Sequence, residues 1–280
     1  MQKRIGLVSR LDHRDALAKS DEIYEFILSK RLMILPETGL ARMQNWDGGC
    51  SISEMVADLV ITVGGDGTVL KTCIGIPKPD TPILSINMGR RGYLTEVEPA
   101  NAIKAVEGYL DGRYRLEDHL KLAAILNERR LADALNEVLI ASTSPSKMLH
   151  FNLRLDDRQL VDCRADSAIV ATATGSTAHA MSAGGPILDR TLDAFVIVFV
   201  CSLEPIRPIV IPAKSSIEIS ILDDRPIGDV IVDGRLQNRL YPGTPLRLRK
   251  SEHKAVFVRF ETPFLSRSLT RLQPREFRAI

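Results

Sequence analysis

The stretch "VITVGGDGTVL", residues 60–70, places an aspartate inside a glycine-rich turn that follows an apolar run. That run, "ADLVITV" at 57–63, is typical of a short buried strand. Gly64, Gly65 and Gly67 permit positive φ and a close approach of the backbone to a ligand. A helix beginning at Thr68 would direct its free N–H groups to the same place. The order of strand, glycine turn and helix therefore predicts a phosphate site at the carboxyl end of a strand in an α/β domain.

Asp66, between the second and third of these glycines, has two interpretations. Aspartate is common in turns for purely structural reasons. A carboxylate beside a transferable phosphoryl group can also accept the proton of an attacking hydroxyl or help to hold Mg²⁺. The turn is not a Walker A loop, because "GGDGTVLK" lacks the Gly-Lys-Ser/Thr ending. Lys71 and the pair Arg90-Arg91 can likewise either steer phosphate or be solvated surface charges.

The pattern along the chain predicts two domains. Over the first 115 residues, strand-like runs such as "RIGLVS" (4–9) alternate with helical spacings such as that of 15–30, which predicts a Rossmann-like parallel sheet covered by helices. From about residue 116, strictly alternating segments such as "MLHFNLRL" (148–155) predict an all-β, sandwich-like domain. We therefore expect an α/β domain over 1–115, a β-rich domain over 116–261, and a tail from about 262 to 280 that packs back on the first domain.

Composition excludes several classes of partner. The formal net charge of the 280 residues is only +2, which gives no indication of a nucleic-acid surface. The longest apolar run, 194–203, is about half the length that spans a bilayer and predicts a buried strand. The N-terminus has no signal-peptide core, so we expect a cytoplasmic protein without membrane partners. No histidine has a spacing typical of a metal site: His13, His119, His150 and His253 lie apart.

A second polar block, "RADSAIVATATGSTAHAMSAGGPIL" at 164–188, combines an aspartate with a run of hydroxyl residues around Gly175. By itself this block could be only a loop. Its order relative to other blocks is more specific: "GGDGT" (64–68), "NMGRRGYL" (87–94), "LNEV" (135–138), the threonine-rich block, and "IVDG" (231–234) follow one another. In this order the chain resembles the NAD kinase family over about residues 4–265, and its compact form resembles the prokaryotic, archaeal type. "GGDGT" alone also occurs in diacylglycerol and sphingosine kinases.

The resemblance implies a reaction and a donor site. NAD would be phosphorylated at the 2′-hydroxyl of its adenosine ribose by ATP, another nucleoside triphosphate or polyphosphate, with Mg²⁺ or another divalent metal. Asp66 matches the general base of the family. Residues that match the donor-phosphate loop are Gly64, Gly65, Gly67 and Thr68. The family also implies a homodimer or homotetramer.

Further matches concern the acceptor. Asn136 and Glu137 match the pair that holds the adenosine ribose and adenine, although the same step could merely end a strand. Asp166 matches an aspartate near the nicotinamide end. The remaining matches to the adenine site and its surroundings are Thr174, Thr177, Ala178, Ser182 and Asp233. Helix capping is the structural alternative for the hydroxyl residues. The sequence departs from the family at His179, where tyrosine is usual, and at Ala173, where proline is more frequent.

Two alternatives remain open at this point. A lipid kinase would share the glycine turn, but it would need an apolar acceptor groove and an affinity for membranes. A non-catalytic NAD-sensing protein would bind NAD without any need for Asp66. The residues do not decide between ATP and polyphosphate, or between NAD and NADH.

Overall fold

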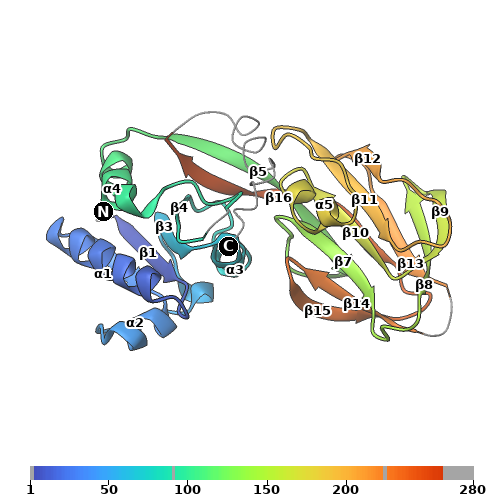
Figure 1. Ribbon diagram of the computed structural model, residues 1–280, viewed down its shortest axis with the longest axis horizontal. Coiled ribbons are helices and arrows are strands. Elements are labelled where there is room, and N and C mark those ends of the chain that lie inside the picture. The colour runs from blue at the N-terminus through green and yellow to red at the C-terminus, as the bar shows by residue number, and fades with distance from the viewer. Residues whose placement is uncertain (1–2, 90–91, 223–225, 261–280) are drawn as a thin grey trace, which may run out of the picture. The chain divides into compact units, whose positions relative to one another are not determined.

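The computed structural model describes residues 3–89, 92–222 and 226–260 (Figure 1). Within these residues the chain forms two compact units, one of residues up to 118 together with 256–260, the other of 119–255. The predicted domain boundary at 115/116 falls at the start of strand β5 (Arg115–Leu126). The predicted tail, about 262–280, and the pair Arg90-Arg91 lie outside the described residues.

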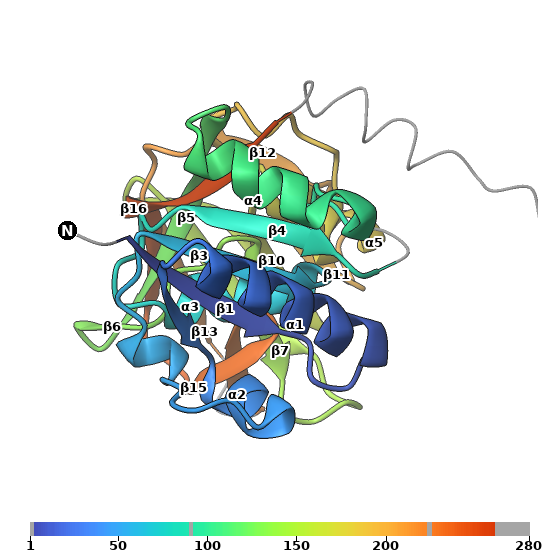
Figure 2. The same ribbon diagram turned by 90° about the vertical axis from the view of Figure 1, so that its left-hand side faces the viewer.

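The first unit contains a parallel sheet with the strand order β2-β1-β3-β4, of which Figure 2 labels β1, β3 and β4. Its strands are β1 (Arg4–Ser9), β2 (Met33–Pro36), β3 (Leu59–Gly64) and β4 (Ile83–Asn87). β3 is buried along its whole length, as is typical of a parallel strand covered on both faces. The register pairs Gly64 with Asn87, so the glycine turn and the "NMG" turn leave the sheet side by side. The predicted Rossmann-like sheet is confirmed.

Helices cover both faces of this sheet. They are α1 (Arg14–Ser29), α2 (Thr38–Gln44), α3 (Asp66–Gly75) and α4 (Ala102–Leu110), with short 3₁₀ turns at Ile52–Glu54 and Pro99–Asn101. α1 and α4 lie over the same face of the sheet (Figure 2). Their residues Ile23, Ile27 and Val106 belong to one core with β1 and β3. These spacings follow the helical period of the sequence.

The second unit is built of antiparallel strands. One sheet has the order β12-β11-β10-β7-β14-β15, and the other contains β13, β8 and β9 beside the start of β16. The bounds are β6 (Arg129–Arg130), β7 (Glu137–Ser142), β8 (Leu149–Leu155), β9 (Arg158–Ala165), β10 (Ser167–Thr172), β11 (Ala194–Val200), β12 (Ile209–Pro212), β13 (Ile217–Ile221), β14 (Gly228–Val232), β15 (Arg235–Leu240) and β16 (Leu246–Arg259). A 3₁₀ turn (Gly175–Thr177) and helix α5 (His179–Ser182) follow β10.

A single core joins the two sheets of this unit. Phe151 of β8 and Phe199 of β11 come from different sheets, and their ring centroids lie 5.8 Å apart. The alternation of "MLHFNLRL" is present as predicted, since Leu149, Phe151 and Leu153 are buried while their neighbours are not. The sandwich-like β domain is therefore confirmed. The chain passes between the two units through β5 and β16.

Candidate functional site

The glycine turn begins where β3 ends, and helix α3 begins at Asp66 itself, two residues earlier than predicted. Gly65 is the N-cap of α3. The side chain of Asp66 is held by the loop that follows the "NMG" turn. The Tyr93 N–H donates to Oδ2 (2.8 Å), while the N–H groups of Leu94 (3.0 Å) and Thr95 (3.4 Å) donate to Oδ1. Two of the predicted motifs thus meet through one carboxylate, whose orientation is set by three backbone amides.

The three glycines of the turn have different structural roles, and none of them adopts positive φ. A Cβ on Gly64 would lie 2.3 Å from Thr68 Oγ1, so Gly64 is required for packing inside the loop. Among the described residues, a Cβ on Gly65 or Gly67 would meet no atom within 4 Å. Neither backbone conformation nor internal packing therefore requires glycine at these two positions. Open space in front of helix-terminal N–H groups is suited to an anion.

Lys71 lies on α3, five residues after Asp66, and its ammonium group is 3.8 Å from the Glu37 carboxylate. Glu37 also accepts a hydrogen bond from the Leu40 N–H at the start of α2. The lysine side chain is 38% exposed, so the ion pair is accessible to solvent and weak. Lys71 therefore lies on the surface of the first unit near the loop, and its charge is paired with that of Glu37.

In the second unit, three predicted motifs converge at one edge of the six-stranded sheet. β7 lies between β10 and β14, and the start of β7 meets the ends of both neighbours. The Asp233 carboxylate accepts hydrogen bonds from three consecutive N–H groups, those of Leu135 (2.7 Å), Asn136 (2.8 Å) and Glu137 (3.0 Å). Asp233 and Gly234 both have positive φ and form the two-residue turn between β14 and β15. "LNEV" and "IVDG", almost 100 residues apart, are thereby fixed to each other.

The threonine-rich block joins this edge through its backbone. A Cβ on Gly175 would lie 2.0 Å from the Asn136 carbonyl oxygen, so only glycine fits there. The Thr172 hydroxyl donates to the Leu135 carbonyl (2.6 Å) and accepts from the Gly175 N–H (3.0 Å). Thr177 donates to the Thr174 carbonyl at 3.3 Å. Neither Thr174 nor Ala178 makes a side-chain cap, so the capping role falls to Thr172.

Burial raises the pKa of the two acidic groups at this edge. Desolvation, with the nearby charge of Asp233, raises the pKa of Glu137 to about 8. Desolvation also raises the pKa of Asp233, while the three backbone hydrogen bonds and Lys121 oppose that shift. Glu137 Oε2 is buried and has no hydrogen-bond partner among the described residues. A buried polar atom of this kind is typical of a place that a ligand or water completes.

The structure also shows which predicted residues lie elsewhere. Asp166 is exposed and precedes β10, whereas Thr174 follows the same strand. Six strand residues separate these ends by about 20 Å, so Asp166 does not join the edge formed by Glu137 and Asp233 within the unit. His179 and Ser182 are exposed on α5, directly after Thr177, and Ala178 is half-buried.

Two buried residues of this region were missed by sequence reasoning. His119 Nδ1 lies 2.9 Å from Thr174 Oγ1, and Lys121 faces Asp233. Both are almost completely buried. In "HLKLA" (119–123) the alternation assigns Leu120 and Leu122 to the core side of the strand. It therefore predicts that the side chains of His119 and Lys121 are exposed to solvent. Alternation along one strand carries no signal for contacts with distant segments, such as that of His119 with Thr174.

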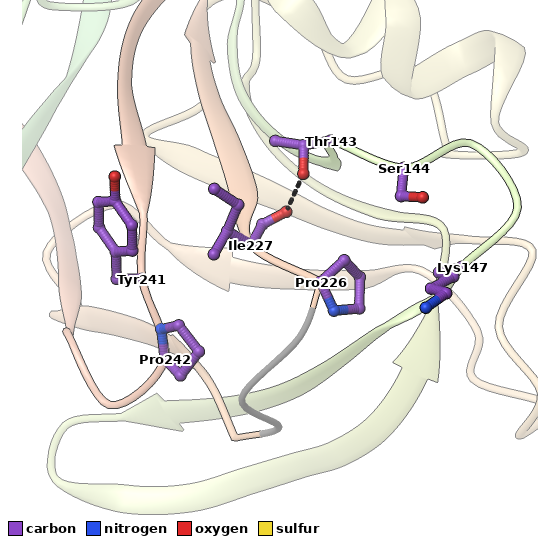
Figure 3. Close-up of a pocket in the computed structure, with 7 residues that line it drawn as sticks. All are labelled: Thr143, Ser144, Lys147, Pro226, Ile227, Tyr241 and Pro242. Carbon is purple, nitrogen blue, oxygen red and sulfur yellow. Dashed lines mark hydrogen bonds between the residues drawn. The ribbon is translucent and has the colours of Figure 1, made fainter.

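A pocket of about 540 Å³ lies at the opposite end of β7, β14 and β15 (Figure 3). It is lined by Thr143, Ser144, Lys147, Pro226, Ile227, Tyr241 and Pro242. The lining residues follow β7 and β15 and precede β14, whereas Asn136, Glu137 and Asp233 lie at the other ends of these strands. The pocket is therefore distinct from the edge where the motifs converge.

Among the described residues, no group of three or more His, Cys, Asp or Glu side chains is arranged to hold a metal ion. Within the same ranges, no helix combines the length and apolarity needed to cross a membrane.

Comparison with known proteins gives these motifs a context. The family model of the ATP-NAD kinase N-terminal domain matches residues 5–114, and that of the ATP-NAD kinase C-terminal domain matches 135–260. The NAD kinase of Methanothermobacter thermautotrophicus is 39% identical over 264 residues, which cover 93% of each chain. The NAD kinase of Pyrococcus abyssi is 36% identical over 286 residues, covering 97% of this chain and 99% of the relative.

Two solved structures are similar over almost the whole chain. An NAD kinase from Archaeoglobus fulgidus in complex with ATP is 27% identical, with a TM-score of 0.78 and coverage of 96% of this chain and 97% of the other. Yeast NADH kinase complexed with NADH has a TM-score of 0.87 at 20% identity, with coverage of 98% and 90%. The second likeness shows the fold alone.

Proposed function

The chain belongs to the NAD kinase family, and we propose that it transfers a phosphoryl group from ATP, another nucleoside triphosphate or polyphosphate to the 2′-hydroxyl of the adenosine ribose of NAD, giving NADP. One observation carries the proposed mechanism. The Asp66 carboxylate lies at the first residue of α3, oriented by three backbone amides beside a glycine turn with open space. We assign donor binding to the first unit and acceptor binding to the second.

The donor-phosphate role rests on the end of α3 and on its glycines. The free N–H groups of the first helical turn stabilise negative charge, and Gly65 and Gly67 leave room for phosphate oxygens to approach them. Thr68 adds a hydroxyl in the same turn. Mg²⁺, when bound, neutralises charge on the donor phosphates. A single carboxylate beside backbone N–H groups fits a metal that is carried mainly by phosphates and water, the usual mode of Mg²⁺ in such sites.

Asp66 accepts the proton in this proposal. An ionised carboxylate has about four acceptor positions, and the recorded amides use two on Oδ1 and one on Oδ2. No other donor among the described residues takes the remaining position on Oδ2, which the 2′-hydroxyl can use. As the hydroxyl oxygen forms its bond to the terminal phosphorus, the bond from phosphorus to the bridging oxygen breaks and the hydroxyl proton passes to Asp66.

The acceptor role rests on Glu137. Its buried Oε2 lacks a hydrogen-bond partner in the described structure, and ribose hydroxyls are donors that would satisfy it. Asn136, Thr174, Thr177, Ala178 and Asp233 lie around the same edge and complete the proposed adenosine site. His179 and Ser182 flank it, and Asp166 remains a proposed contact at the nicotinamide end.

The first experiment measures NADP formation by the purified protein with NAD, Mg²⁺ and either ATP or polyphosphate. Asp66→Asn should lower turnover by about 10²- to 10⁴-fold while NAD binding is retained, and the matched control Asp21→Asn, on the exposed surface of α1, should not. Turnover close to wild type in Asp66→Asn would contradict the base assignment. NAD binding without product from either donor would favour a sensor, and phosphorylation of a lipid alcohol without NAD binding would favour a lipid kinase.

We also propose a cytoplasmic homodimer or homotetramer. β12 supports a subunit contact, because it is an edge strand of its sheet and Val210 on it is 48% exposed. Light scattering of wild type and Val210→Lys tests this, since a lysine in a subunit contact should shift the protein to a smaller assembly.

A further inference from the structure

The peptide group that joins Leu94 to Thr95 is held on both sides. Its N–H, that of Thr95, donates to Asp66 Oδ1 at 3.4 Å. Its carbonyl oxygen, that of Leu94, accepts from the Ser85 hydroxyl at 3.1 Å and from Arg259 Nη1 at 3.2 Å. Because a peptide group is rigid and planar, the direction of the carbonyl fixes the direction of the N–H. One peptide therefore connects Arg259 to the carboxylate of Asp66.

Arg259 is itself immobilised. It is 2% exposed, and its Nε lies 3.2 Å from Glu117 Oε1 and 3.3 Å from Glu96 Oε2. The guanidinium also lies 4.7 Å from the ring centroid of Phe257. Two carboxylates and an aromatic face around a planar cation leave it a single arrangement, which an ammonium group at the end of a lysine would not reproduce. All of these residues belong to the first unit.

We propose that Arg259 is a positioning residue for phosphoryl transfer, because it fixes the Leu94–Thr95 peptide and thereby the orientation of the Asp66 carboxylate. This inference rests on the proposed role of Asp66 as the base. Arg259 lies on β16, almost 200 residues from the glycine turn, and no motif of the sequence marks it. Since its guanidinium acts through Leu94 and makes no proposed contact with either substrate, its loss affects the rate of the chemical step rather than substrate binding.

Removal of Arg259 alone takes away a cation that Glu96 and Glu117 share, and the Glu96 side chain is only 8% exposed, so the change can prevent folding. The test therefore uses two variants. Arg259→Lys keeps the positive charge but loses the planar contact with the Leu94 carbonyl. The triple variant Arg259→Met, Glu96→Gln, Glu117→Gln keeps the volume and removes all three charges. Arg247→Lys, an exposed arginine earlier on the same strand, is the matched control.

Both Arg259 variants should lower kcat by about 10- to 100-fold, the usual consequence of misplacing a reacting group by about 1 Å. The KM values for NAD and ATP should stay within about twofold of wild type when rates are normalised to the folded, NAD-binding fraction. The Thr95 amide should show a changed ¹H–¹⁵N chemical shift. A fall in folded fraction with unchanged kcat per folded molecule would show a purely structural role and overturn the proposal.

A double-variant cycle separates this inference from the proposed function. If Arg259 acts through Asp66, Arg259→Lys should cause little further loss in the Asp66→Asn background. Effects that multiply in the double variant would overturn the positioning role while leaving Asp66 as the base. Full turnover of Asp66→Asn alone would instead contradict the base assignment, and with it the premise of the inference.

Discussion

The protonation of Glu137 provides a sharp test of the acceptor site. Burial raises its pKa from an ordinary 4.5 to about 8. Between these two pH values the folded protein therefore binds one proton more at this position than the unfolded chain, so stability falls as pH rises through the interval. With about 1.36 kcal/mol for each pKa unit, a shift of about 3.5 units corresponds to a loss of up to about 5 kcal/mol.

Glu137→Gln removes this dependence while keeping the shape of the side chain. Urea unfolding, followed by circular dichroism at several pH values from 4.5 to 8.5, should show the wild type losing stability relative to the variant by up to about 1.4 kcal/mol per pH unit. Glu128→Gln is the matched control, because its side chain is 85% exposed in the same unit. The ¹³C carboxyl resonance that disappears in Glu137→Gln should titrate near pH 8. Parallel unfolding curves and a midpoint near 4.5 would refute the reasoning.

The same group links NAD binding to proton release. Ribose hydroxyls that donate to Glu137 favour its ionised form and lower its pKa in the complex. Calorimetric titration with NAD at pH 7, in two buffers of different ionisation enthalpy, should therefore show release of up to about one proton. Glu137→Gln should bind NAD without that release. Proton release that persists in the variant would assign it to another group.

Three further substitutions test the loop and the sheet edge. Gly67→Ala should raise the KM for ATP, because the added methyl group occupies space proposed for a phosphate oxygen. The free energy of unfolding should stay within about 1 kcal/mol of wild type, since the Cβ meets no described atom within 4 Å. An unchanged KM would contradict the phosphate role. Gly175→Ala should cost about 3 kcal/mol of stability or more, since its Cβ would lie 2.0 Å from the Asn136 carbonyl oxygen; thermal unfolding at the wild-type temperature would contradict this contact. Asp233→Ala leaves three backbone N–H groups without their acceptor, at about 1–3 kcal/mol each where buried, and should weaken NAD binding by displacing Glu137; unchanged urea unfolding and NAD titration would argue against it.

The local sequence determined the elements that carry the site. The apolar run, the glycine turn and the helical spacing that follows lie within fewer than 20 residues of one another. For this reason β3, the turn and α3 were predictable from the sequence, apart from the first residue of the helix. The alternation that predicted β8 is equally local. The order of the five motifs added the family and its expected site residues, which no single motif specified.

The tertiary structure decided how those residues are held and in which chemical state. Asp66 is oriented by amides 27 to 29 residues away, Asp233 by amides 96 to 98 residues away, and the Leu94 carbonyl by an arginine 165 residues away. The raised pKa of Glu137 exists only because the surrounding strands exclude water from it. His119 and Lys121 are the clearest examples. Their positions in the alternating pattern predict exposed side chains, whereas in the folded protein the packing of distant segments buries them. Periodicity and turn chemistry are properties of neighbouring residues, whereas burial, hydrogen-bond partners and protonation depend on segments that meet only in the folded chain.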